Sequence, residues 1–370
     1  MSAPINLHRG ADPHAESDGF AGAETLPVAT TWRARCTTRR VVALSGLLWL
    51  AIWAKVGVNF VFGIDVTVDR ARQFPALLQS GDPLSDWSIW SILPVLIGHV
   101  VQATTRTSCA VLHTTILIGG VAATLVAFSR RAGPEVAQRA LLALFATSVP
   151  AYLIFSSGSY DQLLTLLLFA GALSAGRRWP IAIGVLIGLT HAELGLLASM
   201  MLLVLALAGV GPSIGSRVRL LVGVVVARVA LTVWFNARGL HHDRFAFIRA
   251  YGLDTLLGQL PNSWPVALWS VLCGGWIIVG GFVADTRSRR VANALAVCLV
   301  LAVAAMIVTV DQSRVLMLAA MPVVVTIAIH APGPPRRLRA SVAVGLLAPL
   351  CVSVAGTTLI FGDPFSVAWI

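Results

Sequence analysis

Charged residues are scarce in this chain. Only 12% of the 370 residues are Asp, Glu, Lys or Arg, whereas 57% are hydrophobic. A soluble domain carries about 25% charged and about 45–50% apolar residues. A soluble protein of this length would form about two domains with polar surfaces, and too little charge is present to cover them. The composition therefore argues against a soluble enzyme, a secreted disulfide scaffold and a disordered protein, and it predicts a polytopic membrane protein.

Lysine and paired cysteines are also nearly missing. Lys55 is the single lysine among 27 basic residues, and the net charge is +11. Such an excess can attract nucleic acid, but cations on the cytoplasmic loops that orient membrane proteins explain it better, so we expect no nucleic-acid partner. The five cysteines form no Cys-x-x-Cys pair, which predicts apolar fillers and no disulfide framework. The sequence contains no HExxH motif and no matching Cys/His set, so we expect no metal site.

Long apolar runs fill most of the chain. Residues 1–40 are polar and end in arginines, which predicts a disordered, basic cytoplasmic tail before a transmembrane domain at 41–370. A helix crosses the hydrocarbon core with about 20 residues. Eleven runs fit or approach this length: 41–62, 108–128, 140–156, 160–176, 180–191, 194–210, 218–235, 264–284, 291–310, 314–330 and 340–360. The predicted fold is an all-α bundle of about eleven spans, with the fifth span short.

Arginine counts orient this layout. With the N-terminus inside, and counting from residue 33 onward, the inner segments hold 17 arginines and the outer segments hold 7. This bias predicts a multi-pass plasma-membrane protein with a cytoplasmic N-terminus. The outer loops 63–107 and 236–263 are long, and Trp, Ser and aliphatic residues at 86–97 predict interfacial helices in the first. An ordinary aromatic belt would give a similar pattern.

Polar residues gather at the predicted outer helix ends, apart from those in the tail. Ionisable groups near a membrane are costly unless they are paired or functional, so this convergence predicts a site on the outer face. The residues are Asp65, Asp69, Tyr160, Asp161, His191, Glu193, His241, Arg244, Asp311 and Arg314.

Several of these residues also have a purely structural interpretation. Asp65 and Asp69 share a face if their segment is helical, yet loop carboxylates are usually just solvated. Tyr160 and Asp161 follow a serine-rich turn in which Ser159 could cap a helix. His191 and Glu193 could likewise cap helix ends.

The basic residues leave a similar choice open. Arg314 could bind phosphate through its bidentate guanidinium, or it could pair with Asp311. Inside the predicted spans, Lys55 can snorkel toward the interface, whereas Arg228 must find an internal partner.

A family resemblance enters at the first outer loop. The stretches 63–69, 76–84 and 90–94, within a region of about 35 residues, resemble the first periplasmic loop of C-superfamily membrane glycosyltransferases. The similarity is greatest to mannosyltransferases that depend on polyprenyl-phosphate-mannose. Their pattern is Asp, a short gap, Val-Tyr, then Leu-Leu-x-Gly-x-Pro-Leu-Tyr and Tyr-Pro-Pro. Asp65 matches the catalytic carboxylate, but the family's first Tyr is Asp69 here, the Tyr after Pro-Leu is lost, and Tyr-Pro-Pro shrinks to Leu93-Pro94.

The resemblance implies an inverting enzyme on the extracytoplasmic face. It would move mannose or another pyranose or furanose from a polyprenyl-phosphate donor to a glycolipid or glycan acceptor. Asp65, or Asp69 in its place, would be the general base, and Arg314 and Arg244 would hold the donor phosphate. Substrate would contact Tyr160, Asp161, His191, Glu193, His241 and Asp311.

No cofactor is expected, because a phosphomonoester-linked donor needs less charge neutralisation than a nucleotide diphosphate. The alternative function is a multi-pass transporter or a flippase for lipid-linked sugars, in which the short fifth span would be a broken helix at the binding site.

Overall fold

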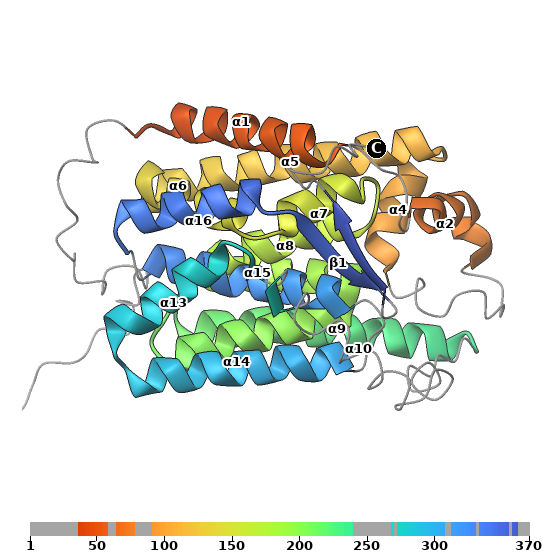
Figure 1. The fold of residues 1–370 in the computed structure, drawn as a ribbon. Helices are drawn as coiled ribbons and strands as arrows, with labels where there is room; N and C mark the ends of the chain where they lie inside the picture. The colour runs from red at the N-terminus through yellow and green to blue at the C-terminus, as the bar shows by residue number, and fades with distance from the viewer. Residues whose placement is uncertain are drawn as a thin grey trace, which may run out of the picture.

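The computed structural model describes residues 36–57, 64–77, 91–239, 268–269, 272–307, 312–330, 333–354 and 357–361. This part of the chain is nearly all helical, with one short hairpin of strands β1 and β2 near its end (Figure 1). The elements are α1 (Thr38–Val56), α2 (Ile64–Leu77), α4 (Ile92–Val100), α5 (Arg106–Ala132), α6 (Pro134–Ala146), α7 (Val149–Phe155), α8 (Asp161–Leu173), α9 (Trp179–Leu207), α10 (Ile214–Ala237), α13 (Gly275–Thr286), α14 (Arg289–Ile307), α15 (Gln312–His330), α16 (Pro335–Leu347), β1 (Leu350–Val354) and β2 (Thr357–Phe361).

Apolar helices indicate a membrane protein, as the composition predicts. Four helices in the described part are long and apolar enough to cross a membrane, namely α5, α9, α10 and most of α15. Helices α6 and α7 are bent by 63° relative to each other, and if they count together as one span, the number of candidate spans rises to five. Helices α8 and α13 are apolar but shorter, with 13 and 12 residues. The predicted eleven crossings are therefore not confirmed.

Helix α9 contains a sharp break at the position of the predicted short fifth span. His191 has φ −163° and ψ 91°, which is not a helical conformation. A Cβ atom on Gly195 would overlap the side chain of Ile187, so these two residues are in contact. In a straight helix, residues eight positions apart would lie about 12 Å from each other. The chain therefore turns back at His191, and its halves match the runs predicted at 180–191 and 194–210. Length and composition alone count both halves as one candidate span.

Small residues let this folded helix pack closely on α10. Cβ atoms at Gly184 and Gly188 would overlap the α10 backbone at Leu220 and Val224, and a Cβ at Gly223 would overlap α9 in turn. Glycine at such crossings allows two helix backbones to approach each other. The resulting contact between α9 and α10 is the most extensive between any two described elements.

Helix α15 runs through the middle of the bundle, in contact with α6, α8, α9, α13 and α14 (Figure 1). Arg314 lies in its first turn and Ala328 near its last residue. Fourteen helical residues separate the two, or about 21 Å. We name the two ends of the bundle after these residues, the Arg314 end and the Ala328 end.

Two predicted segments differ in the structure. Helix α1 begins at Thr38, three residues before the start predicted for the first span, and residues 1–35 of the predicted tail lie outside the described part. The span predicted at 340–360 is wrong, because α16 ends at Leu347 and Leu350–Val354 pairs antiparallel with Thr357–Phe361. Pro349 cannot donate to a continuing helix, and the Val, Thr and Ile residues that follow favour strands.

Two other expectations for single segments can be compared with the structure. The first long loop does contain helices, α2 and α4, although residues 78–90 between them lie outside the described part. Lys55 donates hydrogen bonds to the carbonyl oxygens of Gly345 and Ala348, at the end of α16. Its charge thus meets a helix C-terminus, where cations are stabilised.

Candidate functional site

A buried ion pair joins two helix starts at the Arg314 end. Arg314 Nε donates to Asp161 Oδ2 at 2.7 Å, and Arg314 Nη2 donates to Asp161 Oδ1 at 2.9 Å. The Tyr152 hydroxyl donates to the same carboxylate at 2.9 Å. Asp161 is only 1% exposed. Three hydrogen bonds therefore compensate the burial of this charge.

Helix dipoles explain why these two residues depend on each other. Asp161 is the first residue of α8, where the positive end of the helix dipole stabilises a carboxylate. Arg314 lies in the first turn of α15, where the positive end of the dipole of α15 disfavours a cation. Asp161 supplies the negative charge that makes this position of Arg314 tolerable.

Tyr160 extends the cluster toward the break in α9. Arg314 Nη2 donates to the Tyr160 hydroxyl oxygen at 2.7 Å, and the guanidinium lies 5.2 Å from the centre of the tyrosine ring, within cation–π range. The Tyr160 and His191 rings are 6.1 Å apart, centre to centre. One arginine thus holds a tyrosine that faces the histidine of a different segment.

A second charged group follows at the break itself. Glu193 Oε2 lies 3.4 Å from His191 Nδ1, and Glu193 Oε1 lies 3.4 Å from Arg228 Nη2 on α10. Arg228 therefore has the internal partner that its place in a span requires. The backbone N–H of Leu194 also points at His191 Nδ1, at 3.4 Å. When Nδ1 carries a hydrogen, it can donate that hydrogen to Glu193. When Nδ1 carries none, it accepts from the Leu194 N–H and caps the second half of α9.

The carboxylates of α2 lie beside this region but make separate contacts. Ile64 packs against Gly158, whose φ of +93° suits glycine and whose missing side chain leaves room for Ile64. The next residue, Asp65, accepts hydrogen bonds from Arg106 Nε and Nη2 at 2.5 and 2.6 Å. Its side chain is 57% exposed. Asp69 faces Arg72 at 3.8 Å and is also exposed.

The predicted site residues fall into three groups. The structure brings Tyr160, Asp161, His191, Glu193 and Arg314 together in one chain of contacts. It places Asp65 and Asp69 on neighbouring α2 with arginine partners of their own. His241, Arg244 and Asp311 lie outside the described residues, so the proposed pairing of Arg314 with Asp311 stays a prediction.

Three participants were not anticipated in these roles. The Arg228 position inside an apolar run signalled that a partner must exist, but nothing in the sequence identified Glu193. Tyr152 lies in an apolar run without any distinguishing pattern. The sequence identified Arg106 only as one of the seven arginines of the predicted outer segments. Its contact with Asp65 joins residues that are 41 positions apart.

In the described ranges, no group of three or more His, Cys, Asp or Glu side chains could hold a metal ion. The chemistry that the cluster offers is hydrogen bonding and charge: two guanidinium groups, two carboxylates, two tyrosine hydroxyls and an imidazole. Such groups recognise hydroxyl-rich and anionic ligands.

No protein-family model, no curated protein and no solved structure matches the chain. The function of this cluster must therefore be inferred from its own chemistry.

Proposed function

We propose that the protein is a membrane glycosyltransferase that moves a sugar from a polyprenyl-phosphate donor to a glycan or glycolipid acceptor. We place this reaction on the extracytoplasmic face of the plasma membrane. The observation that carries the proposal is the convergence of Tyr160, His191 and Arg314, from three separate segments, beside the helix that bears Asp65.

The donor phosphate needs a cation that is already in position. We assign this role to Arg314, together with Arg244. Asp161 accepts two hydrogen bonds from Arg314, so within this proposal it positions the guanidinium instead of touching the substrate. A guanidinium held in place before the reaction stabilises the leaving phosphate without reorganisation. Tyr160, His191 and Glu193 then offer hydrogen bonds to sugar hydroxyls, as would His241 and Asp311.

The acceptor hydroxyl must lose its proton during attack. Asp65 would take this proton while the acceptor oxygen bonds to the anomeric carbon. The bond from that carbon to the phosphate oxygen breaks, and polyprenyl phosphate leaves with the electron pair. A single displacement of this kind inverts the anomeric centre. Arg106 fixes the orientation of Asp65, whose exposed side chain an acceptor can reach.

Transport remains the second candidate function because α9 is broken at a polar residue. In transporters, discontinuous helices place binding groups near the middle of the bilayer. Here the chain reverses at His191, so the polar groups lie where both halves of α9 end. This geometry favours a surface reaction over a central path.

A transfer assay with matched variants tests the proposal. The full-length protein in detergent would receive a labelled short-chain polyprenyl-phosphate-mannose and a membrane glycolipid extract as acceptor. Asp65→Asn keeps the shape and removes the basicity, so we expect transfer to fall by about 10²–10⁴-fold. Asp69→Asn is the control, because it removes the other exposed carboxylate of α2.

The outcomes separate the alternatives. Loss of transfer in Asp69→Asn, with full activity in Asp65→Asn, would move the base to Asp69. If vesicles containing the wild-type protein carry labelled donor across the bilayer and form no new glycoside, the enzyme proposal fails and transport replaces it.

A further inference from the structure

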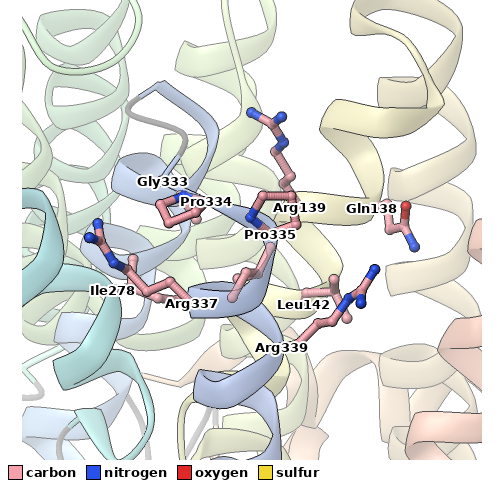
Figure 2. Close-up of a pocket in the computed structure, with 11 residues that line it drawn as sticks. Gln138, Arg139, Leu142, Ile278, Gly333, Pro334, Pro335, Arg337 and Arg339 are labelled. Atoms are coloured by element: carbon pink, nitrogen blue, oxygen red, sulfur yellow. The ribbon is translucent and has the colours of Figure 1, made fainter. Parts of the chain in front are cut away.

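A pocket lies at the opposite end of the bundle, where α6, α13, α15 and α16 meet. Its volume is about 620 Å³, including the space that opens to the outside. Figure 2 shows the lining residues around the turn at Gly333 and Pro334 that leads into α16. Ala328 of α15 also lines it, so about 21 Å of helix separates the pocket from Arg314.

The rim of this pocket is basic. Arg139 comes from α6, and Arg337 and Arg339 come from the first turns of α16. Figure 2 shows their guanidinium groups spread around the opening, not gathered at one point. Among the described residues that line the pocket, none is acidic. Its rim also contains the N-terminus of α16, whose dipole adds partial positive charge.

In the described part of the chain, Arg139 and Arg337 each contact a carboxylate that lies outside the pocket. Arg139 Nη2 lies 3.2 Å from Glu135, one turn earlier on α6. Arg337 donates to Asp285 near the end of α13, with Nη2 3.2 Å from Oδ1. Each arginine carries five N–H donors in a planar fork, and these contacts use one donor of Arg139 and two of Arg337.

The walls are apolar. Leu142 lies one turn along α6 from Arg139, and Ile278 and Leu338 contribute from α13 and α16. A cationic rim over an apolar wall fits a molecule with an anionic head and a hydrocarbon body. A soluble anion would gain nothing from the apolar wall.

We propose that this pocket binds the phosphate group of an anionic phospholipid. Arg139 and Arg339 would donate N–H groups to the phosphate oxygens, and Leu142 and Ile278 would contact the glycerol backbone and the first acyl carbons. Basic pockets between membrane helices bind anionic lipid head groups in this manner. This inference is independent of the proposed transfer reaction, because it concerns other residues at the other end of the bundle.

Lipid selectivity of the reconstituted full-length protein tests the proposal. Spin-labelled phosphatidylglycerol and spin-labelled phosphatidylcholine would be compared in vesicles of fixed composition. Wild-type protein should prefer phosphatidylglycerol. Arg139→Gln with Arg339→Gln should lower this preference by roughly 25-fold, since each arginine near anionic lipid contributes about fivefold.

A second pair of variants controls for net charge. Arg131→Gln with Arg178→Gln removes two exposed arginines that do not line the pocket and should change the preference less than twofold. Equal losses in the two double variants would mean that surface charge alone attracts the lipid, and would overturn the proposal. Full retention of the preference by the pocket variant would overturn it as well.

Two further measurements control for folding and distinguish a lipid from free phosphate. The single variant Arg339→Glu changes an exposed side chain, so it should fold, and it should lower the preference as much as the double variant or more. Inorganic phosphate at millimolar concentration, against chloride of equal ionic strength, should leave the preference intact. If phosphate abolishes it, the pocket takes free phosphate and the lipid assignment is wrong.

Discussion

The two ends of α15 use arginine in different ways. At the Arg314 end, Arg314 contacts Asp161, a carboxylate that lies 153 positions away and is almost fully buried. At the Ala328 end, Arg139 contacts a carboxylate four residues away on its own helix. Arg337 contacts an exposed carboxylate of α13.

The two ends therefore differ in what they can do. The buried pair of Arg314 and Asp161 holds α15 and α8 in one arrangement, so this end is organised before any ligand arrives. Its charges also balance within the cluster. The pair of Arg139 and Glu135 lies within one helix, and the side chain of Asp285 is 52% exposed, so these contacts constrain Arg139 and Arg337 less when an anion approaches. The first end suits orientation of a substrate, and the second suits attraction of an anionic lipid.

The largest effect on stability should come from breaking the buried pair. Asp161→Asn removes the carboxylate charge from Arg314 in a site that is almost fully buried. Removing one partner of a buried ion pair costs about 3–5 kcal/mol. We expect a loss of this size in the free energy of unfolding, measured by denaturant titration in mixed micelles.

The double variant Asp161→Asn with Arg314→Gln sharpens this test. It removes both charges and should recover part of the lost stability. Arg314→Ala alone should weaken binding of the polyprenyl-phosphate donor in the protein that remains folded. If donor affinity is intact there, Arg314 is structural and the main cationic support for a lipid-phosphate donor is gone.

A smaller effect should follow at the second group of the same end. Glu193→Gln keeps the side-chain size but removes the charge between His191 and Arg228. Both contacts are long, at 3.4 Å, and a glutamine can still form hydrogen bonds, so we expect about 1 kcal/mol in the same titration although both carboxylate oxygens of Glu193 are buried. Arg228→Gln should cost a similar amount, and the two changes together should cost less than their sum. Strict additivity would show that the two side chains do not interact.

The sequence predicted the contents of the cluster better than its contacts. Tyr160, Asp161, His191, Glu193 and Arg314 were expected at one face, because polar residues at helix ends must share the few positions outside the apolar core. The contact between Arg314 and Asp161 could not be predicted, since it depends on how α8 and α15 pack. Local pattern favoured the nearer Asp311 instead.

The same limit applies to the fold. The break at His191 is visible in sequence, because a polar His-Ala-Glu step interrupts an apolar run. The pairing of Leu350–Val354 with Thr357–Phe361 is not visible in hydropathy, since strands and membrane helices can both be apolar runs. Pro349 was the signal available there, and span counting by hydropathy ignores it.

The smallest effect belongs to the Ala328 end and has the opposite sign. Asp285→Asn removes the carboxylate that competes for Arg337, so the preference for phosphatidylglycerol should rise by about twofold to fivefold. The hydrogen bond and charge of Arg337 hold the pKa of Asp285 below its ordinary value. Asp285 therefore stays ionised at every pH above the ordinary pKa of an aspartate, about 3.9. The wild-type preference should accordingly be constant between pH 5 and pH 8. A fall in preference in Asp285→Asn, or a change in the wild type within this pH range, would show that Asp285 does not compete with lipid for Arg337.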